Sequence, residues 1–105
     1  MIARVFHAIN PNFGFVSPEY PNPVWPRDYR HVADIELGDI SQRISDFKPI
    51  CEELFRLTNH IDEEWSKNKE IKWAMPKSRS TSVGDIIEID GMYWRVENVG
   101  FVSLT

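Results

Sequence analysis

The sequence predicts a single α+β domain in which one main helix packs on a twisted, mostly antiparallel sheet. Three observations lead to this prediction. The chain has 105 residues, which suits one domain. Apolar residues recur at helical spacing over residues 46–58. Residues 84–99 have the pattern of a C-terminal β-hairpin.

Two strands separated by an unusual loop are expected in the N-terminal third. Residues 2–9 alternate loosely between apolar and polar side chains and predict the first strand. Residues 10–29 hold five prolines among aromatic side chains, which predicts a long ordered loop. Residues 29–37 predict the second strand. This strand is expected to place His31, Ala33 and Ile35 on one face and Val32, Asp34 and Glu36 on the other.

The main helix is expected over about residues 46–58. Asp46 is the best N-cap, and Pro49 suits the first turn. We expect Asn59 to close the helix in a left-handed conformation. The side chains at helical spacing that form the expected buried stripe are Phe47, Ile50, Leu54 and Leu57.

The C-terminal part predicts four more strands. Ile71 and Trp73 alternate as a short strand, and Asp90–Gly91 is a typical two-residue hairpin turn. Residues 101–105 predict a last strand after a bend at Gly100. The inward side chains of the hairpin are expected to be Ile87 and Ile89, with Trp94 and Val96 opposite them. By the same alternation Trp94 and Trp73 are assigned to the core.

Composition limits the classes of function. The net charge of −4 and pI near 5.3 argue against general binding to the nucleic-acid backbone, although a local basic patch is still compatible with them. The single cysteine, Cys51, excludes an internal disulfide and is expected to be a small core side chain. Neither a cofactor nor a metal is expected. The chain lacks a signal-peptide pattern and any transmembrane-length apolar run, so we expect a cytoplasmic protein without a membrane partner.

The preferred function is that of a small acidic, non-enzymatic binding protein that docks on a protein partner. A proline-bound loop rich in aromatic residues must pack on the domain or face a partner, and tryptophan is common at binding hot spots. Both interpretations stay open for Trp25, whereas Trp65 is expected to fix its own segment to the domain. The expected partner-binding residues are Phe13, Phe15, Tyr20, Trp25, Tyr29, Glu52 and Glu53.

The alternative function is nucleic-acid binding through a basic segment. Residues 34–64 carry nine acids against three basic residues, whereas residues 67–79 carry five basic residues against Glu70 alone. Trp65 or Trp73 would then be available to stack on bases. The expected nucleic-acid-binding residues are Lys67, Lys69, Lys72, Lys77 and Arg79.

The stretch Lys77–Asp85, KSRSTSVGD, permits two interpretations. Arg79 and the four hydroxyl residues are donors that could hold a phosphate. A phosphate-binding loop, however, normally uses several glycines or a helix N-terminus, and only Gly84 is present. A glycine bend followed by an aspartate that accepts backbone amide hydrogen bonds is a common way to begin a strand. The structural interpretation is therefore favoured.

Catalysis is the third hypothesis. His60 lies beside Asn59 and Asp62 and could act as a general base, with Cys51, Ser80 or Ser82 as nucleophile. Closing the helix end is the favoured role for His60. The histidines at positions 7, 31 and 60 have no spacing typical of a metal site.

Two segments, LFRLTNHIDEEW and RSTSVGDIIEIDGMYWRVENVGF, resemble a group of small uncharacterised proteins encoded by phages, plasmids and bacterial genomes. The resemblance covers about the C-terminal half, and it leaves out the proline-rich loop and residues 41–50. The group has no assigned activity, so the resemblance implies a mobile-element setting and no mechanism. In that setting, the concrete form of the preferred binding function is a modulator or inhibitor. The matching residues are Leu57, Thr58, Asn59, His60, Ile61, Trp65, Arg79, Ser80, Ser82, Val83, Gly84, Asp85, Val99, Gly100 and Phe101.

Overall fold

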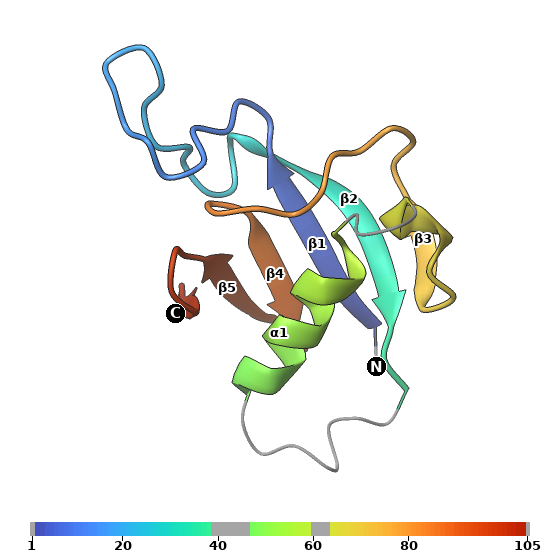
Figure 1. The fold of residues 1–105 in the computed structure, drawn as a ribbon. Helices are drawn as coiled ribbons and strands as arrows, with labels where there is room; N and C mark the ends of the chain where they lie inside the picture. Colours follow the sequence, from blue (N-terminus) through green and yellow to red (C-terminus); the bar gives the residue numbers. More distant parts are fainter. Residues whose placement is uncertain (1, 39–46, 60–63, 105) are drawn as a thin grey trace.

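A six-stranded antiparallel sheet carries one α-helix on one of its faces, in a computed structural model that describes residues 2–38, 47–59 and 64–104 (Figure 1). The expected α+β domain is confirmed. The strands are ordered β3-β2-β1-β4-β5-β6 across the sheet. In chain order the elements are β1 (Ile2–Ala8), β2 (Tyr29–Glu36), α1 (Phe47–Leu57), the 3-10 helix η2 (Trp65–Lys67), β3 (Ile71–Ala74), β4 (Ile86–Ile89), β5 (Met92–Val96) and β6 (Phe101–Ser103).

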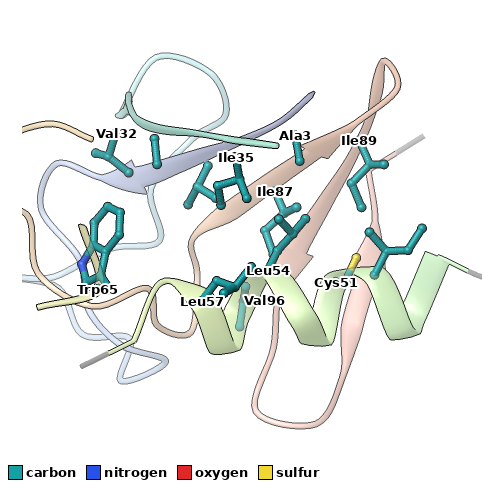
Figure 2. Close-up of a cluster of buried hydrophobic side chains, with 13 residues drawn as sticks. Ala3, Val32, Ile35, Cys51, Leu54, Leu57, Trp65, Ile87, Ile89 and Val96 are labelled. Carbon is teal, nitrogen blue, oxygen red and sulfur yellow. The ribbon is translucent and has the colours of Figure 1, made fainter. Parts of the chain in front are cut away.

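The core lies between α1 and the sheet, as Figure 2 shows. From the helix, Ile50, Leu54 and Leu57 are buried at the expected helical spacing, and Cys51 joins them as expected. Trp65 closes one end of this layer and is also buried, so it fixes its segment to the domain. The buried sheet residues of the cluster are Ala3, Val5, Val32, Ala33, Ile35, Ile87, Ile89 and Val96.

The C-terminal hairpin forms as the sequence predicts. Asp90 and Gly91 both have positive φ, at 52° and 80°, as a type I′ turn requires. Ile87 lies opposite Trp94, whereas the residue opposite Ile89 is Met92. Val96 pairs instead with Phe101 of β6.

The end of α1 differs from the prediction. Asn59 does not adopt a left-handed conformation. Its side-chain amide donates to the carbonyl of Phe55, and the hydroxyl of Thr58 donates to the carbonyl of Leu54 at 2.9 Å. Asn68 donates to the Leu57 carbonyl at 2.7 Å, so side chains take the role that a left-handed residue would have had. The expected N-cap, Asp46, lies outside the described residues.

Two irregularities in strand pairing change which side chains face outward. Val5 pairs with Ala33 but Phe6 pairs with His31, so Val32 is the extra residue of β2 and turns toward the core. His31 is thereby on the face opposite α1. The faces predicted for His31 and Val32 were therefore wrong.

The second irregularity lies between β2 and β3. Trp73 pairs with Asp34, but Ile71 pairs with Ile35, so Lys72 is the extra residue of β3. Ile71 packs against the core, whereas Trp73 faces away from α1 and is 43% exposed. The assignment of Trp73 to the core was therefore wrong. We call the face of the sheet opposite α1 the outer face.

Candidate functional site

The loop between β1 and β2, residues 9–28, is anchored to the body of the domain at its base; we call it the aromatic loop. The amide of Ile9 donates to the carbonyl of Asp28 at 2.9 Å, which continues the strand pairing past Ala8 and Tyr29. Trp25 turns back onto the outer face of the sheet. Its ring lies 5.0 Å from Phe6, 5.1 Å from Tyr93 and 5.3 Å from Tyr29, in tilted or edge-on arrangements.

Of the two interpretations of Trp25, these contacts favour packing on the domain, and Tyr29 is fixed in the same way. Tyr29 is the first residue of β2, and its hydroxyl donates to the carbonyl of Gly84 at 2.5 Å. Burial, together with the nearby Asp85 carboxylate, raises the pKa of Tyr29 to about 12. These two rings therefore hold the base of the aromatic loop on the domain. The surface available to a partner lies farther along the loop, toward its tip.

The outer part of the aromatic loop is ordered by its own hydrogen bonds. Asn12 has the central position, because its side chain donates to the Tyr20 carbonyl at 3.2 Å and to Asn22 at 3.0 Å, and accepts from the amide of Gly14 at 3.0 Å. Ser17 and Tyr20 exchange backbone hydrogen bonds of 3.1 and 3.2 Å. The loop consequently has a defined shape without help from a partner.

Near its base, the loop is tightened by Asp28, whose carboxylate accepts from the amide of Val24 at 2.7 Å and from the Arg27 guanidinium at 2.9 Å. The Arg27 guanidinium, and next the Val24 amide, lower the pKa of Asp28 to about 2. Asp28 therefore stays charged at neutral and mildly acidic pH.

The tip of the aromatic loop exposes apolar side chains to solvent. Phe15 is 82% exposed, Val16 61% and Tyr20 58%. Phe13 is also exposed, but its ring faces the guanidinium of Arg79, whose central carbon lies 5.4 Å from the ring centroid. In Figure 1 the tip extends beyond the ends of β1 and β2, away from α1. Phe15, Val16 and Tyr20 form what we call the apolar tip.

A hollow of about 530 Å³ lies beside the apolar tip, within the loop itself. Tyr20 belongs to both surfaces, and the remaining lining residues combine apolar side chains and proline rings with the polar or charged Asn10, Glu19, Asn22, Arg27 and Asp28. The principal lining residues are Ile9, Tyr20, Pro21, Pro23, Val24 and Arg27. A hollow of this size and character can accept one or two side chains of a partner.

The acidic residues of the helix do not join this surface. Glu52 is exposed on α1, and Glu53 forms an ion pair with Arg56, with nitrogen–oxygen distances of 2.5 and 3.0 Å. That contact lowers the pKa of Glu53 and raises that of Arg56. Since α1 lies over the sheet and the loop points away from it, the expected partner-binding residues fall into two separate sets (Figure 1).

The stretch Lys77–Asp85 is built as the beginning of a strand. The carboxylate of Asp85 is fully buried and accepts the amides of Ala8 at 3.0 Å and Ser82 at 2.8 Å. The Arg79 guanidinium donates to both Asp85 oxygens, at 2.7 and 2.8 Å, and also to the carbonyls of Ser80 and Ala8. Arg79 is therefore occupied within the protein, and the structure does not favour a phosphate site there.

His7 is the buried neighbour of this ion pair, and sequence reasoning gave it no structural role. Its Nε2 lies 2.9 Å from the Thr81 hydroxyl and 3.8 Å from the Asp85 carboxylate. Burial lowers the pKa of His7 to about 4, and the positive charges of Arg79 and Arg30 act in the same direction. Since Asp85 opposes this shift but does not overcome it, His7 is neutral at physiological pH. His7, Thr81 and Asp85 are all buried, and His7 also lines a hollow of about 380 Å³.

The basic segment separates into exposed and buried residues. Lys67, Lys69, Lys72 and Lys77 are exposed, and no salt bridge joins them to another described residue. Trp65 is buried, with its indole nitrogen donating to the Arg79 carbonyl at 3.0 Å, so it cannot stack on a base. Trp73, by contrast, is accessible.

The outer face brings together side chains that the sequence did not single out. The ring of Trp73 lies 5.0 Å from that of His31, with 31° between the planes, and His31 in turn lies 5.4 Å from Phe6. The His31 Nε2 donates to Asp34 at 2.8 Å and to the carbonyl of Ala33 at 3.1 Å. These three rings form a row on the outer face. The row results from the two extra residues in β2 and β3, for which the sequence offers no local signal.

Arg30 is a further residue that the sequence analysis missed. It lines a hollow of about 380 Å³ together with Lys77 and Arg79. Arg30 is the second residue of β2, whereas Lys77 follows β3, so only the pairing of these strands reveals that they are neighbours. No salt bridge to another described residue involves Arg30 either.

No protein-family model matches this chain, and comparisons with the curated proteins and with the solved structures found no match. Within residues 2–38, 47–59 and 64–104, no group of three or more His, Cys, Asp or Glu side chains could hold a metal ion. None of the described helices is long and apolar enough to cross a membrane. His60 and Asp62, on which the catalytic hypothesis depends, lie outside the described residues.

Proposed function

We propose that this is a non-enzymatic binding protein that docks on a protein partner through the aromatic loop and acts as its modulator or inhibitor. The observation that carries the proposal is the apolar tip: Phe15, Val16 and Tyr20 are 82%, 61% and 58% exposed on a loop held by its own hydrogen bonds. Exposed apolar side chains gathered at one place are typical of an interaction surface.

The order of the loop favours binding. A segment that is already fixed loses little conformational freedom on association, so more of the contact energy contributes to affinity. The prolines at positions 11, 18, 21, 23 and 26 restrict the backbone, and Asn12 joins both sides of the loop. The partner surface that fits the apolar tip is a groove lined by apolar side chains, while the hollow near Tyr20 receives a side chain from the partner.

The non-enzymatic part of the proposal rests on the surroundings of His7. A histidine beside a threonine hydroxyl and an aspartate has the composition of a catalytic group. All three side chains are buried, however, and the aspartate is committed to Arg79 and to two backbone amides. The group therefore lacks a free aspartate to orient the histidine and an exposed hydroxyl to act as nucleophile.

The mobile-element setting is also part of the proposal, and it comes from the resemblance of the C-terminal half. A small protein can act by occupying a surface of a larger protein, and a protruding, preformed contact is suited to this. The apolar tip supplies such a contact, and it lies in the part of the chain that the resemblance does not cover.

The test is site-specific photo-crosslinking in cells, followed by affinity measurement with the purified partner. Benzoylphenylalanine is placed at position 15 in the loop and, as the control, at position 99. Val99 is 92% exposed in the turn between β5 and β6, so the two positions are equally accessible but lie on different segments.

We expect a cross-linked protein from position 15 that position 99 does not give. The identified partner should bind the Phe15→Ser/Tyr20→Ser variant about tenfold or more weakly than the wild type, since two central hot-spot residues are removed. The Val99→Ser variant should bind as the wild type does. Equal cross-linking from both positions, or equal binding by the double variant, would contradict the proposal.

A further inference from the structure

We propose that the β3 edge of the sheet is a second binding site, which takes single-stranded nucleic acid. A base stacks on Trp73 on the outer face, and the phosphates beside it are held by Lys72 and Lys77 along the edge. This site is independent of the aromatic loop. It uses part of the basic segment of the sequence, but Arg79 and Trp65 do not belong to it, because both are held within the protein.

Trp73 has the geometry of a stacking platform. Its ring is 43% exposed, and the covered part lies against His31, with ring centroids 5.0 Å apart and an angle of 31° between the planes. His31 is itself held by its hydrogen bonds to Asp34 and to the carbonyl of Ala33. An aromatic ring that is supported on one side and free on the other can accept a base with little loss of side-chain entropy.

The position of Trp73 next to Lys72 places positive charge beside the ring. Lys72 is the extra residue of β3, so its backbone interrupts the regular pairing and its exposed side chain stands at the free edge of the sheet. β3 has β2 on one side, and on its other side no strand is formed by the described residues. A flexible ligand can therefore run along this edge without displacing any described strand.

Farther along the same edge, Lys77 extends the positive charge. The amide of Met75 donates to the carbonyl of Val32 at 2.8 Å, so the chain after β3 continues alongside β2. Arg30 is not part of the site, because it pairs with the buried His7 and both line the 380 Å³ hollow on the face of the sheet that carries α1. Lys77 has φ of 59° in a turn, so the five positions from Lys72 to Lys77 span less than the roughly 16 Å of an extended chain, which is the length of a few nucleotides.

The other charges at this edge determine the expected strength of binding. Lys67 and Lys69 add two exposed cations before β3, while Glu36, Asp34 and Glu70 supply negative charge nearby. Asp34 is engaged by His31. The balance is positive but not large, which predicts modest affinity with a marked salt dependence.

Single-stranded nucleic acid is the occupant that these features fit. Stacking on Trp73 requires an unpaired base, whereas a duplex would offer only phosphates to the lysines. An acidic peptide would satisfy the same positive charges but has no flat ring system in every unit to use Trp73. The aromatic ring and the positive charge together therefore distinguish the three possible ligands.

The experiment measures fluorescence anisotropy of a labelled mixed-sequence oligonucleotide of about 12 nucleotides at low salt. The same strand annealed to its complement and a polyglutamate peptide of equal charge are the competitors. The variants are Trp73→Ala, Trp73→Phe, and Lys72→Ala/Lys77→Ala, and the matched control is Lys48→Ala, which removes an exposed lysine on α1. Circular dichroism of each variant establishes that the fold is retained.

We expect Trp73→Ala to weaken binding about tenfold, Trp73→Phe to restore most of it, and the double lysine variant to reduce the salt dependence. Lys48→Ala should bind like the wild type, and the competitors should displace the probe poorly. The proposal is overturned if the wild type does not bind, if Trp73→Ala binds equally well, or if the duplex or polyglutamate competes as well as the single strand. If Trp73→Ala does not fold, Trp73→Phe and the double lysine variant are compared with Lys48→Ala. The proposal is then overturned if the double lysine variant has the same salt dependence as Lys48→Ala.

Discussion

Arg79 and Asp85 form a bidentate ion pair in which the carboxylate is fully buried, at distances of 2.7 and 2.8 Å. The same carboxylate receives the amide of Ala8, so a single side chain joins the end of β1 to the beginning of β4. Removing one member of a buried, hydrogen-bonded pair leaves the other charge without compensation, which is one of the more costly changes in a protein interior.

The first prediction concerns this pair. Asp85→Asn should lower the free energy of unfolding by about 3–5 kcal/mol, because it leaves the Arg79 guanidinium without its counter-charge in a buried site. Urea denaturation followed by tryptophan fluorescence measures the loss. The matched control is Glu97→Gln, which breaks the partly exposed Arg95–Glu97 pair and should cost about 1 kcal/mol or less. Equal losses in the two variants would show that the buried pair stabilises the domain no more than the partly exposed pair does.

The second prediction is a pH dependence of stability that originates at His7. The folded protein holds the pKa of His7 at about 4, below its ordinary value of 6.5, so between these values the unfolded chain binds more protons. The contribution of neutral His7 to the free energy of unfolding is therefore complete above about pH 6.5 and is lost as the pH falls toward 4. From the two pKa values it is on the order of 3 kcal/mol, at about 1.4 kcal/mol for each pKa unit.

The measurement compares the wild type with His7→Gln by urea denaturation at about pH 7 and about pH 5. Carboxylates titrate mostly below this interval, and those that do titrate are common to both proteins. The wild type should lose stability between the two conditions more steeply than the variant does. Parallel losses would mean that His7 does not titrate as its burial requires.

The elements that local patterns define could be predicted from the sequence. The Asp90–Gly91 turn and the helical spacing of Ile50, Leu54 and Leu57 depend on near neighbours, and both form as expected. The outer face could not be predicted, because it depends on Val32 and Lys72 being extra residues in their strands. Such an irregularity is decided by pairing with a distant segment, and each one reverses the faces of the side chains that follow.

In the candidate sites, too, some features could be predicted from the sequence and others only from the structure. Proline and aromatic composition indicated the aromatic loop, but only the packing of Trp25 on Phe6 and Tyr93 separates its anchored base from its exposed tip. The basic segment was visible as a run of lysines. That Arg79 is withdrawn from it depends on Asp85 and Ala8, and Ala8 lies 71 positions away from Arg79 along the chain.

The third prediction tests the turn of the hairpin. Gly91 has φ of 80° and no atom lies within 4 Å of the position that a Cβ would take, so any cost of a side chain there is conformational. Gly91→Ala should destabilise the domain by about 1–2 kcal/mol, the cost of a left-handed L-residue. Gly91→Asn should cost less, because asparagine tolerates this conformation. Thermal denaturation of the two variants checks the order, and an asparagine variant no more stable than the alanine variant would contradict it.

The last prediction concerns the anchoring of the aromatic loop by Trp25. Its ring contacts Phe6, Tyr29 and Tyr93, and each aromatic pair contributes about 0.5–1.5 kcal/mol beyond simple burial. Trp25→Ala should therefore favour local opening of the loop base. Since local opening governs amide exchange, the amides of Ile9, Val24 and Asp28, which are all hydrogen-bonded there, should exchange about tenfold faster or more. Phe15→Ala is the matched control, because it removes an aromatic side chain that is 82% exposed, and it should leave these three amides unchanged. If exchange is equally fast in both variants, Trp25 does not anchor the loop, and the rigidity on which the proposed docking depends must come from the backbone hydrogen bonds alone.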